Sequence, residues 1–143
     1  MNMTELYTKS DELINTHFGD ISLQGRTNPA LYVFDDTGVS QVKMRTGEQN
    51  STPEDTEYEK KQGAQAMKII SQNPKVKAML LVMDTVVKDE EGQSEDMLLS
   101  MLYSREESHV RSISHGDAGI TDFGWEETAC GGRFGNPWIS NSE

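Results

Sequence analysis

The segment VKAMLLVMDTVVKD, which runs from Val76 to Asp89, constrains the fold more than any other part of the chain. Its apolar residues follow one another without a break from Ala78 to Met83, whereas a strand with one face in water alternates between apolar and polar residues. We therefore expect a central strand in a sheet that is covered on both faces. The apolar run is also far too short to cross a bilayer.

The residues before this strand predict two helices and a hairpin. A first helix is expected to begin at an N-cap, Thr4, and to end at Gly19. The segment from Leu31 to Phe34, followed by an Asp-Thr-Gly turn at 36–38 and a second strand, is typical of a β-hairpin. A second helix is expected over 53–72, because a threonine cap, a proline and two acidic residues open it and Asn-Pro closes it.

The residues after the central strand predict further antiparallel strands joined by polar turns. The acidic turn at 89–92 leads into a strand whose two faces both carry apolar residues: Met97, Leu99, Met101 and Tyr103 on one face and Leu98 and Leu102 on the other. A shorter strand at 109–114 follows. The last strand, GITDFGWEET, is expected to place Thr121, Phe123 and Trp125 on one face.

This order of elements predicts an α+β fold: a largely antiparallel sheet of about five to six strands with two helices packed on it. Residues 1–128 are expected to form a single domain, and 129–143 a tail that contains glycine and aromatic residues. If both helices cover the same face of the sheet, Leu98, Leu102 and Ile120 would be exposed together as a dimer interface. We accordingly expect a homodimer.

The formal net charge of −11 excludes several classes of function. A negative field opposes contact with nucleic-acid phosphates and with anionic lipid, so no nucleic acid and no membrane is expected as a partner. A single cysteine cannot form an internal disulfide, and the first residues lack the pattern of a signal peptide. We expect a cytoplasmic protein.

The order of elements resembles small uncharacterised α+β proteins of bacteria and their phages. The segments that carry the resemblance are PALYVFDDTG, the helix leading into VKAMLLVMDTVV, DMLLSMLYSREES and GWEETACGGRF. The chain departs from the pattern at 84–86, where it has Asp-Thr-Val instead of an acidic, a small and an aromatic residue. The resemblance implies a similar order of helices and strands and a phage origin. It implies no activity and no site residues.

Catalytic and metal-binding patterns are weak in this sequence. Cys130, His115 and Asp117 have the residue types of a nucleophile, a base and an orienting acid, but neither their spacing nor a local signature brings them together. The three histidines lack the spacing of a zinc site, and no phosphate-binding glycine motif is present. No metal, no cofactor and no catalytic residue is expected.

The C-terminal aromatic residues carry the binding hypothesis, because aromatic and arginine side chains dominate interface energetics. The expected binding residues are Trp125, Arg133, Phe134 and Trp138. For Trp138 the sequence leaves a second interpretation open, in which its ring packs over the open end of the sheet. Asp84 follows a buried strand and needs a partner, for which Arg105 or Arg111 is expected. Asp84, Arg111 and His115 are therefore candidates for a ligand site or an ion pair.

The sequence favours a small, acidic, non-enzymatic protein that binds another protein and modulates it, in keeping with a phage-encoded protein directed at a host system. The alternative is a protein that binds or sequesters a small ligand such as a nucleotide or metabolite. A hydrolase that uses His115 and Asp117 is the third hypothesis.

Overall fold

The computed structural model of the chain describes residues 2–24, 29–43, 64–88, 90–116, 119–128 and 136–138. Helix α1 (Met3–Gln24) comes first, and a second helix is described over 64–71. The strands are β1 (Ala30–Asp35), β2 (Gly38–Lys43), β3 (Val76–Lys88), β4 (Ser94–Ser104), β5 (Ser108–Gly116) and β6 (Gly119–Glu127). The predicted α+β class is confirmed.

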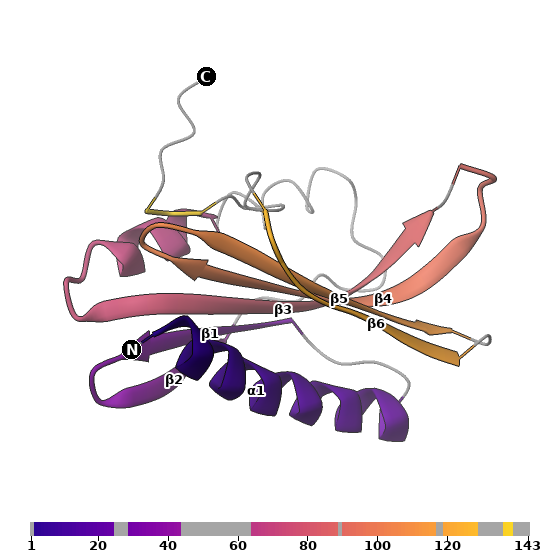
Figure 1. The fold of residues 1–143 in the computed structure, drawn as a ribbon, viewed down its shortest axis with the longest axis horizontal. Helices are drawn as coiled ribbons and strands as arrows, with labels where there is room; N and C mark the ends of the chain where they lie inside the picture. Colours follow the sequence, from indigo (N-terminus) through magenta and orange to yellow (C-terminus); the bar gives the residue numbers. More distant parts are fainter. Residues whose placement is uncertain are drawn as a thin grey trace.

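The strands form one six-stranded sheet in the order β2-β1-β3-β4-β5-β6, and every neighbouring pair is antiparallel. The sheet twists strongly along its length (Figure 1). The predicted β1–β2 hairpin is present, and Asp35 closes its turn because its Oδ1 accepts hydrogen bonds from Thr37 N and Gly38 N at 2.8 and 3.0 Å. Gly38 has a φ of 142°, which side chains rarely adopt, so glycine suits this turn.

Helix α1 begins earlier and ends later than the sequence predicts. Asn2 is its N-cap, since Asn2 Oδ1 accepts a hydrogen bond from Glu5 N at 2.9 Å. The helix continues through Gly19 to Gln24. Phe18 and Ile21 pack against the core on either side of Gly19, and this packing outweighs the low helix propensity of one glycine. The predicted Thr4 cap and Gly19 terminus are therefore wrong.

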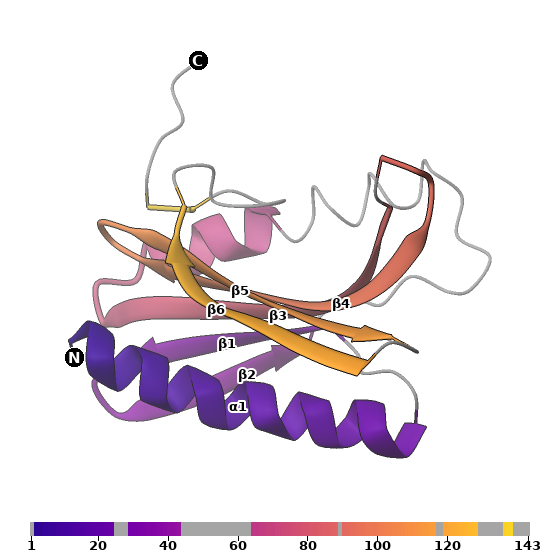
Figure 2. The ribbon, with the colours of Figure 1, turned by 45° about the vertical axis from the view of Figure 1, so that its right-hand side comes forward.

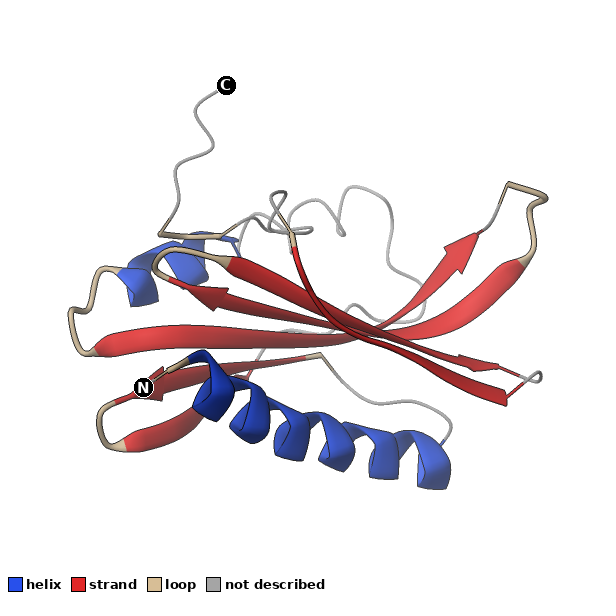
Figure 3. Ribbon diagram, in the orientation of Figure 1, coloured by secondary structure: helices blue, strands red, loops and turns tan. Residues whose placement is uncertain are grey.

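Both faces of the sheet are covered, as the apolar run in β3 predicts. The two helices lie on opposite sides of the sheet (Figure 3). On the α1 face, Leu6 and Ile14 of the helix pack on Phe34 and Leu80. On the opposite face, Met67 of the helix at 64–71 packs on Met79 and its strand neighbours.

Alternation in β4 divides its side chains between these two cores. Leu98 and Leu102 belong to the α1 core, and each is 0% exposed. Met101 and Tyr103 belong to the opposite core. The exposed interface expected at Leu98 and Leu102 is therefore absent, because the helices cover different faces of the sheet.

Strand β6 contains a bulge that changes which of its side chains share a face. Arg111 pairs with Trp125 and Ile113 with Asp122, so β6 has one residue more than β5 between these pairs. Gly124 takes a φ of 75° at this point. Trp125 packs against the α1 core, whereas Phe123 is 56% exposed. The expected common face of Phe123 and Trp125 is wrong, since the bulge interrupts the alternation.

None of the helices among the described residues is long and apolar enough to span a membrane. The predicted start of the second helix, at 53–63, lies outside those residues, and its predicted end near Gln72 agrees with the last helical residue, Ser71.

Candidate functional site

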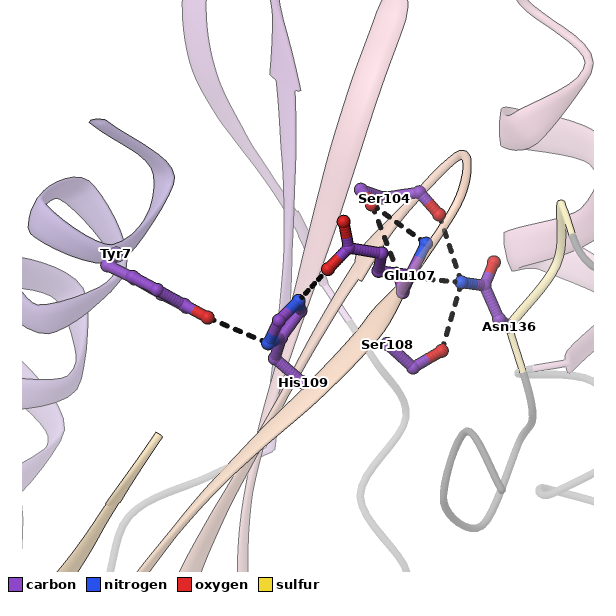
Figure 4. Close-up of polar contacts among 6 residues, drawn as sticks. All are labelled: Tyr7, Ser104, Glu107, Ser108, His109 and Asn136. Atoms are coloured by element: carbon purple, nitrogen blue, oxygen red, sulfur yellow. Dashed lines mark hydrogen bonds and ion pairs between the residues drawn. The ribbon is translucent and has the colours of Figure 1, made fainter. Parts of the chain in front are cut away.

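A chain of hydrogen bonds runs from Tyr7 of α1 through His109 of β5 to Glu107 (Figure 4). Tyr7 Oη lies 2.7 Å from His109 Nδ1, and His109 Nε2 lies 2.8 Å from Glu107 Oε2. The tautomer of His109 with its proton on Nε2 is compatible with both contacts, because the Tyr7 hydroxyl can then donate to Nδ1. Burial raises the pKa of Tyr7, and the negative charges of Glu107 and Glu127 raise it further. A phenol with a raised pKa keeps its proton, as donation to His109 Nδ1 requires.

Arg111 joins α1 to β6 through two carboxylates. Its Nη1 donates to Asp11 Oδ1 at 2.6 Å, and its Nε donates to Asp122 Oδ1 at 3.2 Å while Nη2 contacts Asp122 Oδ2. The hydrogen bonds from Arg111 hold the pKa of Asp122 below its usual value. In the same way, the hydrogen bonds to Asp122 and the charge of Asp11 raise the pKa of Arg111. This cluster fastens the helix to the β5–β6 hairpin.

Trp125, an expected binding residue, takes part in the same cluster. Its indole Nε1 donates to Asp11 Oδ1 at 3.0 Å. Its ring is stacked on Tyr7, with centroids 5.1 Å apart and an interplanar angle of 24°. Residues of α1 thus contact the polar atom and one ring face of Trp125. The sequence could not predict these contacts, because α1 and β6 are far apart along the chain.

Asp84 pairs with His115 rather than with either expected arginine. His115 Nε2 lies 2.9 Å from Asp84 Oδ1. The sheet register explains the pairing: Asp84 is opposite Leu98, and Leu98 is opposite Ile113, so the residue two positions after Ile113 lies on the same face. Arg105 instead donates to the carbonyl oxygens of Pro74 and Val76, at 3.3 and 2.9 Å.

The third histidine, His17, also lies between α1 and the sheet, where its Nε2 is 2.8 Å from Tyr32 Oη. Burial lowers the pKa of His17 below 6.5, although the charge of Asp20 opposes this shift. The unfolded chain therefore takes up more protons than the folded one below pH 6.5, and the free energy of unfolding is expected to fall as the pH drops through the folded-state pKa.

This prediction is checked by urea unfolding of the wild type and of His17→Gln between about pH 7 and about pH 5. Glutamine can keep a hydrogen bond to Tyr32 and does not titrate. The wild type should lose more stability than the variant over this interval, and parallel profiles would contradict the assignment.

Trp138 packs on the sheet face opposite α1. It contacts the core around Met79 and Tyr103, and its Nε1 donates to Ser71 O at 2.9 Å. The guanidinium carbon of Arg105 lies 5.6 Å from the centre of its ring. These contacts attach residue 138 to the domain.

Asn136, which sequence reasoning missed, secures the same part of the chain. Its Nδ2 lies 2.9 Å from Ser104 O, 3.0 Å from Glu107 O and 3.0 Å from Ser108 Oγ (Figure 4). Its Oδ1 accepts a hydrogen bond from Trp138 N at 2.9 Å. The Asn-Pro pair at 136–137 is a turn signal that could have identified this residue.

The remaining sequence candidates lie outside the described residues. These are Arg133 and Phe134 of the tail, and Asp117 and Cys130 of the hydrolase hypothesis. Within the described ranges, no group of three or more histidine, cysteine, aspartate or glutamate side chains is arranged to hold a metal ion.

The edge strand β6 has exposed apolar side chains and exposed acidic side chains side by side. Ile120 is 70% exposed and Phe123 is 56% exposed. Asp122, Glu126 and Glu127 are exposed on the same strand, which contains no basic residue. Figure 2 shows β6 at the edge of the sheet, beside β5.

Comparison with known proteins adds no relative: no family model, no curated protein and no solved structure matches this chain.

Proposed function

We propose that this protein is a small, acidic, non-enzymatic binding module that docks onto a basic region of another protein in the cytoplasm. The observation that carries the proposal is the surface of β6, where Ile120 and Phe123 are exposed among carboxylates. Interfaces with partners combine an apolar centre with a charged surround that selects the partner.

The charges of the surrounding strands support a basic partner. Residues 94–116 and 119–128 contain two arginines, and their carboxylates are those of Glu95, Asp96, Glu106, Glu107, Asp122, Glu126 and Glu127. Both arginines are already engaged, Arg105 by backbone carbonyls and Arg111 by Asp11 and Asp122. The uncompensated charge on this part of the surface is therefore negative.

The internal contacts of two histidines, one of them His115 of the hydrolase hypothesis, also favour binding over catalysis. His109 is held between Tyr7 and Glu107, and His115 is held by Asp84. These histidines link helix and strands to one another, so their contacts serve to hold the fold together.

The proposal is tested by titrating the protein with a lysine-rich peptide at about 150 mM salt, where exposed charges are well screened. Saturable binding is expected, weakened in a Glu126→Gln/Glu127→Gln variant. The matched control is Glu5→Gln/Glu12→Gln, which changes the net charge equally on the exposed side of α1. Equal weakening in both variants, or no saturable binding, would contradict the proposal.

A further inference from the structure

We propose that β6 binds its partner by strand addition: an extended, basic segment of another protein pairs with the outer edge of residues 120–123. This inference rests on the proposed function and adds the site, the geometry and the kind of partner. It follows from the position of β6 in the sheet, from its exposed side chains, from its bulge and from its charge.

The outer edge of β6 is the free side of the sheet as far as the described residues show. The strand is hydrogen-bonded to β5 on one side, and among the described residues no strand lies on its other side. The backbone N–H and C=O groups along such an edge form a template for a further strand. Peptide recognition of this kind takes its affinity from the backbone and its specificity from alternate side chains.

The exposed apolar side chains lie on both faces of this edge. Ile120 pairs with His115, which faces α1 through its contact with Phe18. Asp122 pairs with Ile113 of the α1 core, so Phe123, which follows Asp122 directly, points to the opposite face. An added strand would therefore bury Ile120 on one face and Phe123 on the other, beside its own alternating side chains.

The bulge limits the length of the paired segment. Gly124 N donates to Asp122 Oδ1 at 2.9 Å, and the positive φ of Gly124 bends the strand after Phe123. Gly119 also has a positive φ, of 113°, so the edge with regular strand backbone spans residues 120–123. Glu126 and Glu127 lie beyond the bend, where they can meet basic residues at one end of the bound segment.

The charge of β6 selects a basic partner over a second copy of this chain. Its charged residues are Asp122, which is paired with Arg111, and Glu126 and Glu127. Pairing of two β6 strands would bring these glutamates toward a second chain that also carries a net charge of −11. The opposite edge strand, β2, has the sequence GVSQVK and contains no acidic residue. A basic segment is therefore expected to bind the β6 edge in preference to the β2 edge.

The test uses a peptide of about ten residues that alternates valine and lysine, together with the same peptide carrying N-methyl groups on alternate backbone amides. Backbone amide hydrogen exchange of the full chain is followed by NMR. Addition of the unmethylated peptide is expected to slow exchange in β6 and to leave β2 unchanged. The methylated peptide, which has lost donors on one edge, is expected to bind about ten-fold more weakly.

Two variants locate the contact. Ile120→Thr/Phe123→Thr removes the apolar side chains, keeps strand propensity and leaves the charge unchanged, so peptide binding is expected to weaken by about ten-fold. Val39→Thr makes a similar change at an exposed position of β2 and is expected to bind as the wild type does. Urea unfolding of both variants confirms that they are folded.

The outcomes separate this inference from the proposed function. Saturable binding with slowed exchange in β2 or α1, or with equal affinity for the methylated peptide, would overturn strand addition and leave the binding function standing. Absence of binding by both peptides would overturn both proposals. Light scattering could instead show a dimer whose β6 amides are already protected before peptide is added. That result would mean that β6 pairs with a second copy of the chain, and it would overturn the proposal of a basic partner.

Discussion

Replacing Leu98 with alanine is expected to lower the free energy of unfolding by about 3 kcal/mol. Leu98 is 0% exposed and packs in the core between α1 and the sheet. The substitution removes buried apolar surface and leaves a cavity whose walls are the strands and the helix, which relax only in part. Urea unfolding monitored by circular dichroism measures the change.

The matched control is Ile120→Ala, which removes an aliphatic side chain at a position that is 70% exposed. The expected loss there is below about 0.5 kcal/mol, because most of the side chain remains in water in the folded protein. If the two substitutions lowered the free energy of unfolding by similar amounts, Leu98 would be as exposed as Ile120. That result would contradict a sheet with one helix on each face.

Replacing Arg111 with alanine is expected to destabilise the protein by about 2 kcal/mol. The change leaves the carboxylates of Asp11 and Asp122 without the cation that lies between them. The guanidinium is mostly buried but both carboxylates are partly exposed, so the expected loss is smaller than for a fully buried pair. Arg111→Lys should recover part of the loss, since an ammonium group keeps the charge but cannot form the same forked contacts.

The pH dependence of this loss identifies its cause. Arg111 holds the pKa of Asp122 below its usual value of 3.8. The stabilisation from the pair is therefore fully present above pH 3.8 and disappears as the pH falls through the folded-state pKa of Asp122. The difference between the wild type and Arg111→Ala should shrink in this range. A difference that stays constant with pH would assign the effect to lost packing of the arginine side chain.

Secondary structure and fold class followed from local patterns in this chain. The unbroken apolar run in β3 indicated a strand covered on both faces, and the Asp-Thr-Gly turn indicated the β1–β2 hairpin. The alternation of apolar residues in β4 assigned Leu98 to one face and Met101 to the other. These properties depend on residues close in sequence, so the sequence was sufficient to predict them.

The errors arose where a contact between distant segments overrode a local signal. Gly19 would end an isolated helix, yet packing of Phe18 and Ile21 on the sheet carries α1 through it. The bulge at Gly124 moved Phe123 to the exposed surface. A glycine inside a strand often marks a bulge, so Gly124 was a local signal that strict alternation overlooked.

The sequence by itself determined the α+β class, the antiparallel sheet and the net negative charge, because these follow from residue order and composition. It left open which faces of the sheet the helices cover, and the tertiary structure places one helix on each face. Only the tertiary structure decided which charges meet. Asp84 reaches His115 through the register of three strands, and Asp11 reaches Arg111 and Trp125 from the other end of the chain. Such pairings depend on how the helix crosses the sheet, and that crossing is set by the whole core at once.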